Sequence, residues 1–193
     1  KKSGGITRSH LRFGNTPIHS QYLVAQEDFV ACHNQAFIGR FDLLNGIKEN
    51  GVFLLNSNWS RDEAFYNLTR PMQETIINKN IRFYNIDGLK IAEEVGLGGR
   101  INTTMQTAFF LISGVLERNE AIKLIKESIK KTYTRKGEDI VQMNLEAVDR
   151  VNEALVEIEV PKTLPDKYMP MKKLVPENAD DFILNVIEPV MRE

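Results

Sequence analysis

The chain has 193 residues and a formal net charge of −1, with 42% hydrophobic and 26% charged residues. This balance is typical of one soluble globular domain with a sizeable core, and it gives no general bias toward nucleic acid or a membrane surface. No apolar run of about 18 residues and no secretory leader is recognised, so we expect a cytoplasmic protein outside the membrane.

The predicted elements of the first half alternate between short apolar runs and helical patterns, which is typical of an α/β domain. Strands are expected at 6–13, 29–32, 51–56 and 81–86, with a further short apolar segment at 21–24. Helical segments are expected after a cap at Asn34, after a Ser60–Glu63 capping box, from Pro71 to Lys79, and over 89–95 after a cap at Asp87. We therefore expect an α/β fold of three layers, α/β/α, with a central, mixed sheet.

The second half is predicted to be helical. Apolar residues step at three or four positions over 101–114, 120–133 and 138–158, which indicates three helices that face a core. Pro161 ends the regular domain, and 162–176 is interpreted as a linker or wrapping arm. The amphipathic piece at 182–190 is expected to dock on this domain or on something beyond it.

Cys32 is the only cysteine, which excludes an internal disulfide and a four-cysteine zinc or iron–sulfur site. It lies in an apolar run, which favours a structural thiol over a nucleophile. His33 would face the opposite side of a strand, so the two residues do not form a catalytic pair. His10 and His19 have no partner at metal-ligand spacing, and we predict no metal site.

The most informative segment is the glycine-rich run Gly96–Arg100, which leads into a predicted helix at Ile101. A glycine-rich turn before a helix exposes backbone N–H groups that bind anions, and Arg100 adds a cation; a nucleotide-like cofactor phosphate would fit. The alternative is that Gly96 only closes the preceding helix and Gly98 and Gly99 form an ordinary loop. The run is not a dinucleotide-binding motif, because that motif follows a strand.

For two asparagines and the amino terminus as well, both a structural role and a ligand-binding role remain open. Asn144 falls on the apolar stripe of the longest helix, where its amide either bonds to a neighbouring loop or contacts a ligand. Asn102 is either a helix-capping residue or a phosphate or ribose partner. The basic, glycine-bearing stretch at 1–5 is either a frayed terminus or part of a site.

No acid–base constellation accompanies these residues, since the carboxylates fall on caps and solvated helix faces without a paired histidine or nucleophile. A free-standing phosphotransfer or nucleotide enzyme would need a carboxylate pair or a phosphate-loop Lys/Ser, and none is placed. The residues alone therefore indicate an α/β domain, and they leave open whether it binds a phosphorylated ligand.

The amino-acid sequences of several segments resemble those of one protein family. These segments are KKSGGIT at 1–7, SHLRFG at 9–14, DFVACH at 28–33, FLLNS at 53–57, 96–110 and Met143-Asn144. They are similar to the gamma domain, or domain III, of pyruvate:ferredoxin (flavodoxin) oxidoreductase, and they cover about residues 1–160. The end of the chain resembles the connection toward the iron–sulfur region, so we expect a domain at 1–160 and a linker with a terminal helix at 161–193.

The resemblance implies an activity for a larger parent enzyme of anaerobic metabolism. This family oxidatively decarboxylates pyruvate, joins the two-carbon unit to coenzyme A and passes electrons through iron–sulfur clusters to ferredoxin or flavodoxin. Thiamine diphosphate and the clusters belong to the parent only, because this chain has neither cluster cysteines nor a Gly-Asp-Gly motif. The implied partners are the other domains of a homodimeric parent and, through it, ferredoxin or flavodoxin, with no nucleic acid and no membrane.

The gamma domain of this family is associated with coenzyme A, which implies binding roles for matching residues here. The first candidates are Lys2, Asn102 and Asn144, followed by Lys1, Ser3, Gly99 and Arg100. In the family a further strand and glycine-rich loop precede this stretch, so we expect an incomplete site and an exposed sheet edge. The alternative function is a structural spacer or interaction domain of the same enzyme that binds no ligand of its own.

Overall fold

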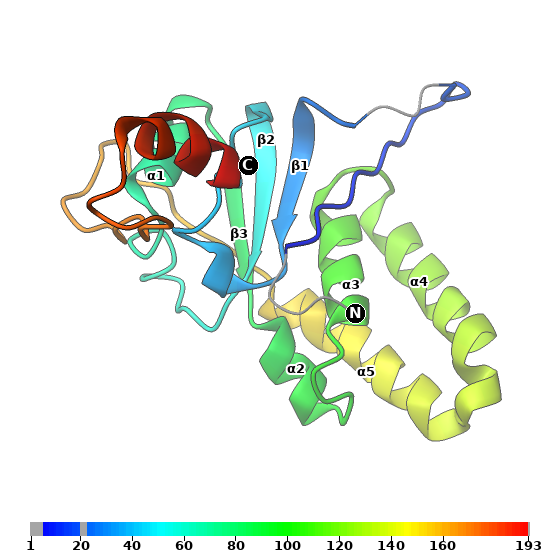
Figure 1. Ribbon diagram of the computed structural model, residues 1–193. Helices are drawn as coiled ribbons and strands as arrows, with labels where there is room; N and C mark the ends of the chain where they lie inside the picture. The colour runs from blue at the N-terminus through cyan, green and yellow to red at the C-terminus, as the bar shows by residue number, and fades with distance from the viewer. Residues whose placement is uncertain (1–5, 20–22, 193) are drawn as a thin grey trace.

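The computed structural model of the chain describes residues 6–19 and 23–192 (Figure 1). The strands are β1 Glu27–Cys32, β2 Ile47–Asn56, β3 Arg82–Ile86 and β4 Val156–Glu157. The α-helices are α1 Arg70–Asn78, α2 Gly88–Glu94, α3 Asn102–Ile112, α4 Arg118–Tyr133, α5 Glu138–Ala154 and α6 Glu188–Arg192. Short helices of other types are η1 Gln35–Phe37, η2 Thr134–Lys136 and η3 Ile183–Ile187.

The four strands form one mixed sheet in the order β1-β2-β3-β4. β1, β2 and β3 are parallel to one another, and β4 pairs antiparallel with β3. Figure 1 shows the sheet between α1 on one side and α3, α4 and α5 on the other. The predicted three-layer α/β/α fold with a mixed sheet is therefore confirmed.

Strand β2 explains why both faces of the sheet are covered. Its last six residues are all buried, and successive side chains point to opposite faces. Phe53 and Leu55 join the core beneath α1, where Phe53 stacks on Phe83 of β3 at 5.2 Å between ring centroids. Leu54 joins the other core, which α2, α3 and α5 complete. A continuous apolar strand thus requires a helical layer on each side.

Helix α5 ends earlier than predicted. The apolar stripe suggested a helix to Ile158, but α5 ends at Ala154, and Val156 and Glu157 form β4. The backbone N–H of Ile158 then donates to the Phe83 carbonyl at 2.8 Å, and the Ile158 side chain is buried in the core beneath α1. Pairing with the open edge of β3 replaces the last helical turn, while Ile158 stays buried as its apolar character requires.

Three other predictions differ from the structure. Residues 6–13 are extended but form no strand within the described part of the chain, and their contacts run through side chains instead: Val24 N–H donates to His10 Nδ1, and Phe13 stacks on Phe109. The Ser60 hydroxyl does bond to Glu63, yet 61–67 folds as turns. Asn34 does cap, but only the single turn η1. The capping hydrogen bonds form at both sites, but no long helix follows, because the apolar face after each cap is too short to extend one.

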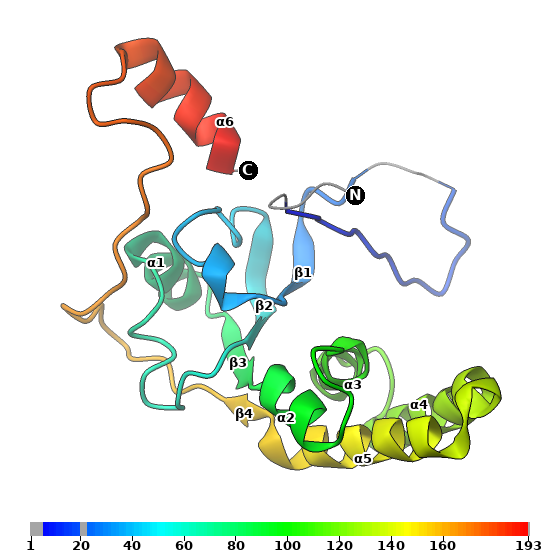
Figure 2. The same cartoon turned by 60° about the horizontal axis from the view of Figure 1, so that its bottom comes forward.

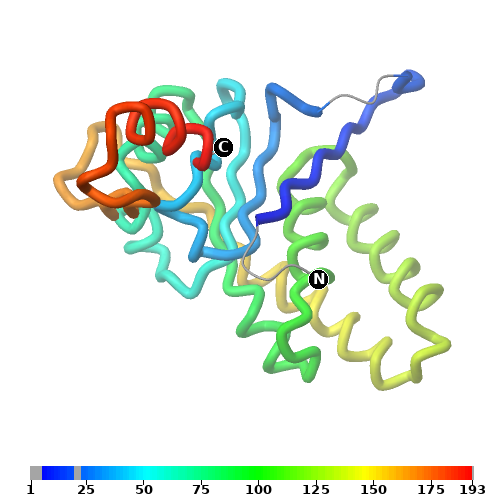
Figure 3. The backbone as a smooth tube through the Cα atoms, in the orientation of Figure 1, coloured from blue at the N-terminus to red at the C-terminus, as the bar shows by residue number. Residues whose placement is uncertain are grey.

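The segment after β4 runs back over the α1 side of the molecule, as the orange and red parts of Figure 3 show. Met169 N–H donates to the Leu68 carbonyl at 2.9 Å, and the Arg70 guanidinium lies 4.3 Å from the Tyr168 ring centroid. Farther along, the Arg192 carbonyl accepts from Asp42 N–H at 2.8 Å. Figure 2 shows this segment on the opposite side of the sheet from α4 and α5. The segment after β4 therefore does not cover the surface around α3 and α5.

Candidate functional site

The loop between α2 and α3 begins with a glycine-closed helix end. Gly96 has a φ of +84°, its N–H donates to the Glu93 carbonyl, and Leu97 N–H donates to the Ala92 carbonyl at 2.7 Å. This is the Schellman pattern of backbone hydrogen bonds, in which glycine takes the left-handed position. The helix-closing interpretation of Gly96 is confirmed, and the α-helix before the loop agrees with the exclusion of a dinucleotide-binding motif.

A pocket of about 320 Å³ opens beside this loop, between the start of α3 and the turn that joins α4 to α5. We call it the α3–α5 pocket. Its lining consists of Leu97, Arg100, Asn102, Thr103, Tyr133, Lys136, Ile140 and Asn144. Three of the predicted site residues, Arg100, Asn102 and Asn144, therefore lie together. Gly99 is in the adjoining loop but does not line the pocket, and Lys1, Lys2 and Ser3 lie outside the described residues.

Asn144 is held in place by two hydrogen bonds and is only 3% exposed. Its Oδ1 accepts from the Thr103 hydroxyl at 2.6 Å, and its Nδ2 donates to the Ile140 carbonyl at 2.7 Å. The amide nitrogen carries two hydrogens, and the second has no acceptor among the described residues. The local bonding expected as one alternative is thus present, and the side chain still borders the pocket.

The side chains of Asn102 and Arg100 make fewer hydrogen bonds than that of Asn144. Asn102 is the first residue of α3 and is exposed, and its side chain makes no hydrogen bond to any described residue. Arg100 donates from Nε to the Leu97 carbonyl at 3.0 Å, which orients the guanidinium while its two terminal nitrogens have no hydrogen-bond partner within 6–19 and 23–192. Among the described residues no side chain caps α3, so the first N–H groups of the helix have no hydrogen-bond acceptor there. Within this part of the chain, the loop and the helix start therefore present several donors without a partner.

Lys136 and Tyr133 were missed by the sequence analysis. Tyr133 is the last residue of α4 and Lys136 the last residue of η2, and the Lys136 ammonium lies 5.2 Å from the Tyr133 ring centroid. The signal that singled out Asn144, an amide on an apolar helix stripe, does not extend to Lys136, because Lys136 lies in η2, before α5 begins. Lys136 nevertheless reaches the same pocket as Ile140 and Asn144 of α5. All three line the pocket.

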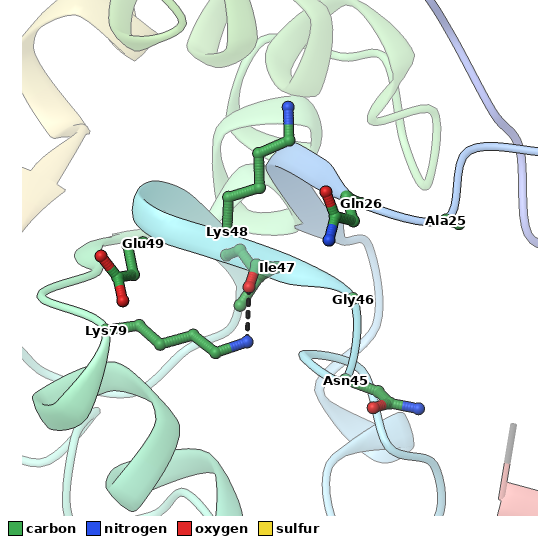
Figure 4. A pocket seen from close by; sticks show the side chains of 8 residues that line it. All are labelled: Ala25, Gln26, Asn45, Gly46, Ile47, Lys48, Glu49 and Lys79. Carbon is green, nitrogen blue, oxygen red and sulfur yellow. Dashed lines mark hydrogen bonds between the residues drawn. The ribbon is translucent and has the colours of Figure 1, made fainter.

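The charge of the lining distinguishes this pocket from another hollow of similar size, about 330 Å³, at the start of β2. In that hollow Lys79 donates to the Ile47 carbonyl at 2.6 Å, and Glu49 adds a carboxylate (Figure 4). Lys48, which also lines it, pairs with Asp28 at 2.8 Å. The described lining of the α3–α5 pocket contains two cations and no carboxylate. An anion is therefore favoured there and not at the β2 hollow.

Cys32 has the environment of a structural thiol. It is 4% exposed, its Sγ donates to the Asn34 carbonyl at 3.2 Å, and burial raises the pKa of the thiol to about 11. A thiol that stays protonated at neutral pH is a poor nucleophile. Burial also lowers the pKa of His33, so its imidazole is neutral at physiological pH.

Residues 6–19 and 23–192 contain no group of three His, Cys, Asp or Glu side chains arranged to hold a metal ion. None of the helices in that part of the chain is both long and apolar enough to cross a membrane.

Comparison with known proteins places the chain in a family. The family model described as pyruvate ferredoxin/flavodoxin oxidoreductase matches residues 1–154. The chain is 53% identical over 190 residues to pyruvate:ferredoxin oxidoreductase of Moorella thermoacetica, covering 98% of this chain and 16% of that protein. It is 44% identical over 186 residues to pyruvate-flavodoxin oxidoreductase of Rhodospirillum rubrum, covering 96% and 15%. The chain thus spans about a sixth of the length of these curated relatives.

A solved structure supports the fold. The crystal structure of pyruvate oxidoreductase subunit PORC from Thermotoga maritima matches with a TM-score of 0.54 and 19% identity, covering 70% of this chain and 67% of that one. This likeness bears on the fold alone, whereas the family model covers most of the chain. The chain belongs to the pyruvate ferredoxin/flavodoxin oxidoreductase family.

Proposed function

We propose that this chain contributes to binding coenzyme A within an enzyme that oxidises pyruvate and transfers the electrons to ferredoxin or flavodoxin. The observation that carries the proposal is the convergence of Arg100, Asn102 and Asn144 in one pocket whose described lining holds no carboxylate. Arg100 and Asn102 are neighbours in the sequence at the start of α3, whereas Asn144 comes from α5, farther along the chain. The family resemblance indicated Arg100, Asn102 and Asn144 from the sequence alone, independently of their positions in the structure.

The donors of the pocket suit a phosphorylated ligand. Coenzyme A carries a diphosphate and a 3′-phosphate, and Arg100, Lys136 and the Asn102 amide all offer hydrogen-bond donors. A Cβ built on Gly98 or Gly99 meets no atom of the described residues within 4 Å, so these residues leave room for a ligand to approach the loop backbone closely. A volume of about 320 Å³ is at the lower end for small-molecule sites. We therefore assign to this pocket a phosphate-bearing end of the cofactor, and not the whole of it.

The remaining steps of the reaction belong to other parts of the parent enzyme under this proposal. Coenzyme A supplies the thiol that accepts the two-carbon unit, while thiamine diphosphate and iron–sulfur clusters act elsewhere. Lys1, Lys2 and Ser3 would complete the cofactor site from the amino-terminal side. Residues 161–193 would lead from this domain, residues 1–160, toward the iron–sulfur region of a homodimeric, cytoplasmic enzyme.

The competing function is a structural spacer that binds no ligand. The hydrogen bonds of Asn144 to Thr103 and Ile140 favour it, because they explain this buried amide without a ligand. They do not explain Asn102, whose side chain has no hydrogen-bond partner among the described residues. The two functions therefore make opposite predictions for Asn102.

Calorimetric titration of coenzyme A into the chain separates them. We expect saturable binding that Asn102→Ala weakens about tenfold, the loss expected for one hydrogen bond to a charged group. Lys123→Ala is the surface control, because Lys123 is exposed on α4 and lies about 15 Å along that helix from its end at Tyr133. Absence of binding, or equal affinities for the wild type and Asn102→Ala, would contradict the proposal and favour the spacer function.

A further inference from the structure

We propose that Arg100 and Lys136 form a subsite for a phosphate monoester, which makes the α3–α5 pocket selective for the 3′-phosphate of coenzyme A. This inference rests on the proposed function and names the part of the ligand that the pocket recognises. Neither Lys136 nor Tyr133 was indicated by the sequence patterns. The assignment follows from the side chains that the two loops bring to one pocket.

Tyr133 positions Lys136. The lysine ammonium lies 5.2 Å from the centroid of the Tyr133 ring, within the range in which a cation is attracted to an aromatic face. Lys136 makes no ion pair with a described carboxylate. Glu138 and Asp139 follow it in the first turn of α5, but neither lines the pocket. The aromatic contact therefore restricts the lysine without neutralising it.

Arg100 supplies the second cation from the loop before α3. Its Nε bond to the Leu97 carbonyl fixes the guanidinium to its own turn, and its terminal nitrogens make no hydrogen bond within the described residues. Arg100 also lacks an ion pair to any described carboxylate. Two positioned cations that border one pocket without a carboxylate beside them are suited to an anion of charge near −2.

A phosphate monoester matches this requirement better than a diphosphate does. A monoester carries about −1.5 to −2 charges near neutral pH on one group with three acceptor oxygens. Each bridging phosphate of a diphosphate ester carries a single charge and is well bound by backbone N–H groups alone. The subsite should therefore discriminate coenzyme A from dephospho-coenzyme A, which differs from it only in the 3′-phosphate.

The measured quantity is the ratio of dissociation constants for dephospho-coenzyme A and coenzyme A, obtained by calorimetry on the whole chain. We expect a ratio of about ten or more for the wild type and for the Lys123→Ala control. Lys136→Ala should bring the ratio down to about two or less. Thermal unfolding of each variant, followed by circular dichroism, verifies that it is folded.

Tyr133 is tested by a conservative pair, since a purely structural role would not change the ratio. Tyr133→Phe keeps the ring beneath the ammonium and should leave the ratio unchanged. Tyr133→Leu removes the ring and should lower the ratio about two- to fivefold, which corresponds to an exposed cation–π contact. Equal ratios for the two variants would show that Tyr133 does not position Lys136, and this would overturn its role in the subsite.

The outcomes separate this inference from the proposed function. Equal affinity of the wild type for the two ligands, or undiminished discrimination by folded Lys136→Ala, would overturn the phosphate subsite while coenzyme A binding stands. Failure of the chain to bind either ligand would overturn both. Loss of discrimination in Lys136→Ala together with its retention in Lys123→Ala would support the subsite.

Discussion

The Thr103 hydroxyl donates a 2.6 Å hydrogen bond to Asn144 Oδ1, and this bond joins the first turn of α3 to the middle of α5. Thr103 is 7% and Asn144 3% exposed, so both polar groups are withdrawn from water. The Asn144 amide is further fixed by its bond to the Ile140 carbonyl. The same contact therefore holds two helices together and sets the position of a side chain that borders the α3–α5 pocket.

Removing the hydroxyl should destabilise the fold. Thr103→Val keeps the side-chain shape but leaves Asn144 Oδ1 buried without a donor, at a cost of about 1–3 kcal/mol in the free energy of unfolding. Urea denaturation measures this loss. Combined with Asn144→Ala, the double variant should lose less than the sum of the single losses, with a coupling of about 0.5–3 kcal/mol. Strict additivity would contradict the paired role of the two residues.

Asn102, unlike Asn144, should contribute to ligand binding without contributing to the stability of the fold. Because it is exposed and has no described hydrogen-bond partner, Asn102→Ala should change the free energy of unfolding by no more than about 0.5 kcal/mol. The same variant should bind coenzyme A less tightly. Asn144→Ala should lower both stability and affinity. A large loss of stability in Asn102→Ala would mean that the residue is structural and would remove its proposed role.

The glycines of the α2–α3 loop should differ from one another. At Gly96, with φ +84°, an added Cβ would lie 3.3 Å from the Met143 methyl group, so Gly96→Ala should cost about 1–2 kcal/mol. Gly98 also has a positive φ, +59°, but its Cβ would meet nothing within 4 Å, so Gly98→Ala should cost about 1 kcal/mol. Gly99 has neither constraint and serves as the matched control, expected within about 0.5 kcal/mol of the wild type. Thermal unfolding ranks the three variants, and any other order would contradict this account of the loop.

Cys32 should resist alkylation in the native state. Burial raises the pKa of its thiol from the ordinary value of 9.0 to about 11, so the reactive thiolate is scarce at pH 8. Iodoacetamide should label the thiol at the rate of a free cysteine only after unfolding in urea, as followed by mass spectrometry. Labelling of the native chain at the rate of the unfolded chain would contradict the buried position of Cys32.

The same pKa predicts a pH dependence of stability. Below pH 9 the thiol is protonated in both states, and its contribution to stability is complete. Between about pH 9 and 11 the unfolded state loses the proton first, so the free energy of unfolding should fall as pH rises. Comparison with Cys32→Ala isolates this component, because the other groups that titrate in this range are unchanged. A wild-type minus variant difference that does not fall over this range would contradict the prediction.

Much of the fold was predictable because the signals were local. The apolar run at 51–56 identified the central strand β2, Asp87 marked the start of α2, and the apolar spacing after Arg100 identified α3. β4 was not predictable in this way, since Leu155 and Ile158 continue the apolar helical spacing of α5 on either side of Val156 and Glu157. Their strand pairing depends on the open edge of β3, which is a tertiary contact.

The site was predictable in part for the same reason. Asn144 was noticed because an amide on an apolar stripe is unusual, and Arg100 because it follows a glycine run. Lys136 had no such local signal, since it is one of several basic residues at the end of α4. Only the packing of α3 against α5 places its turn beside Arg100, and sequence spacing contains no information on that packing.

The most direct test of the central claim is a crystal structure of this chain soaked or grown with coenzyme A. We predict phosphate density in the α3–α5 pocket, with the 3′-phosphate between Arg100 and Lys136 and another polar group of the ligand within hydrogen-bond distance of Asn102. Coenzyme A seated at the β2 hollow beside Lys79, or an α3–α5 pocket empty of ligand at saturating concentration, would contradict it.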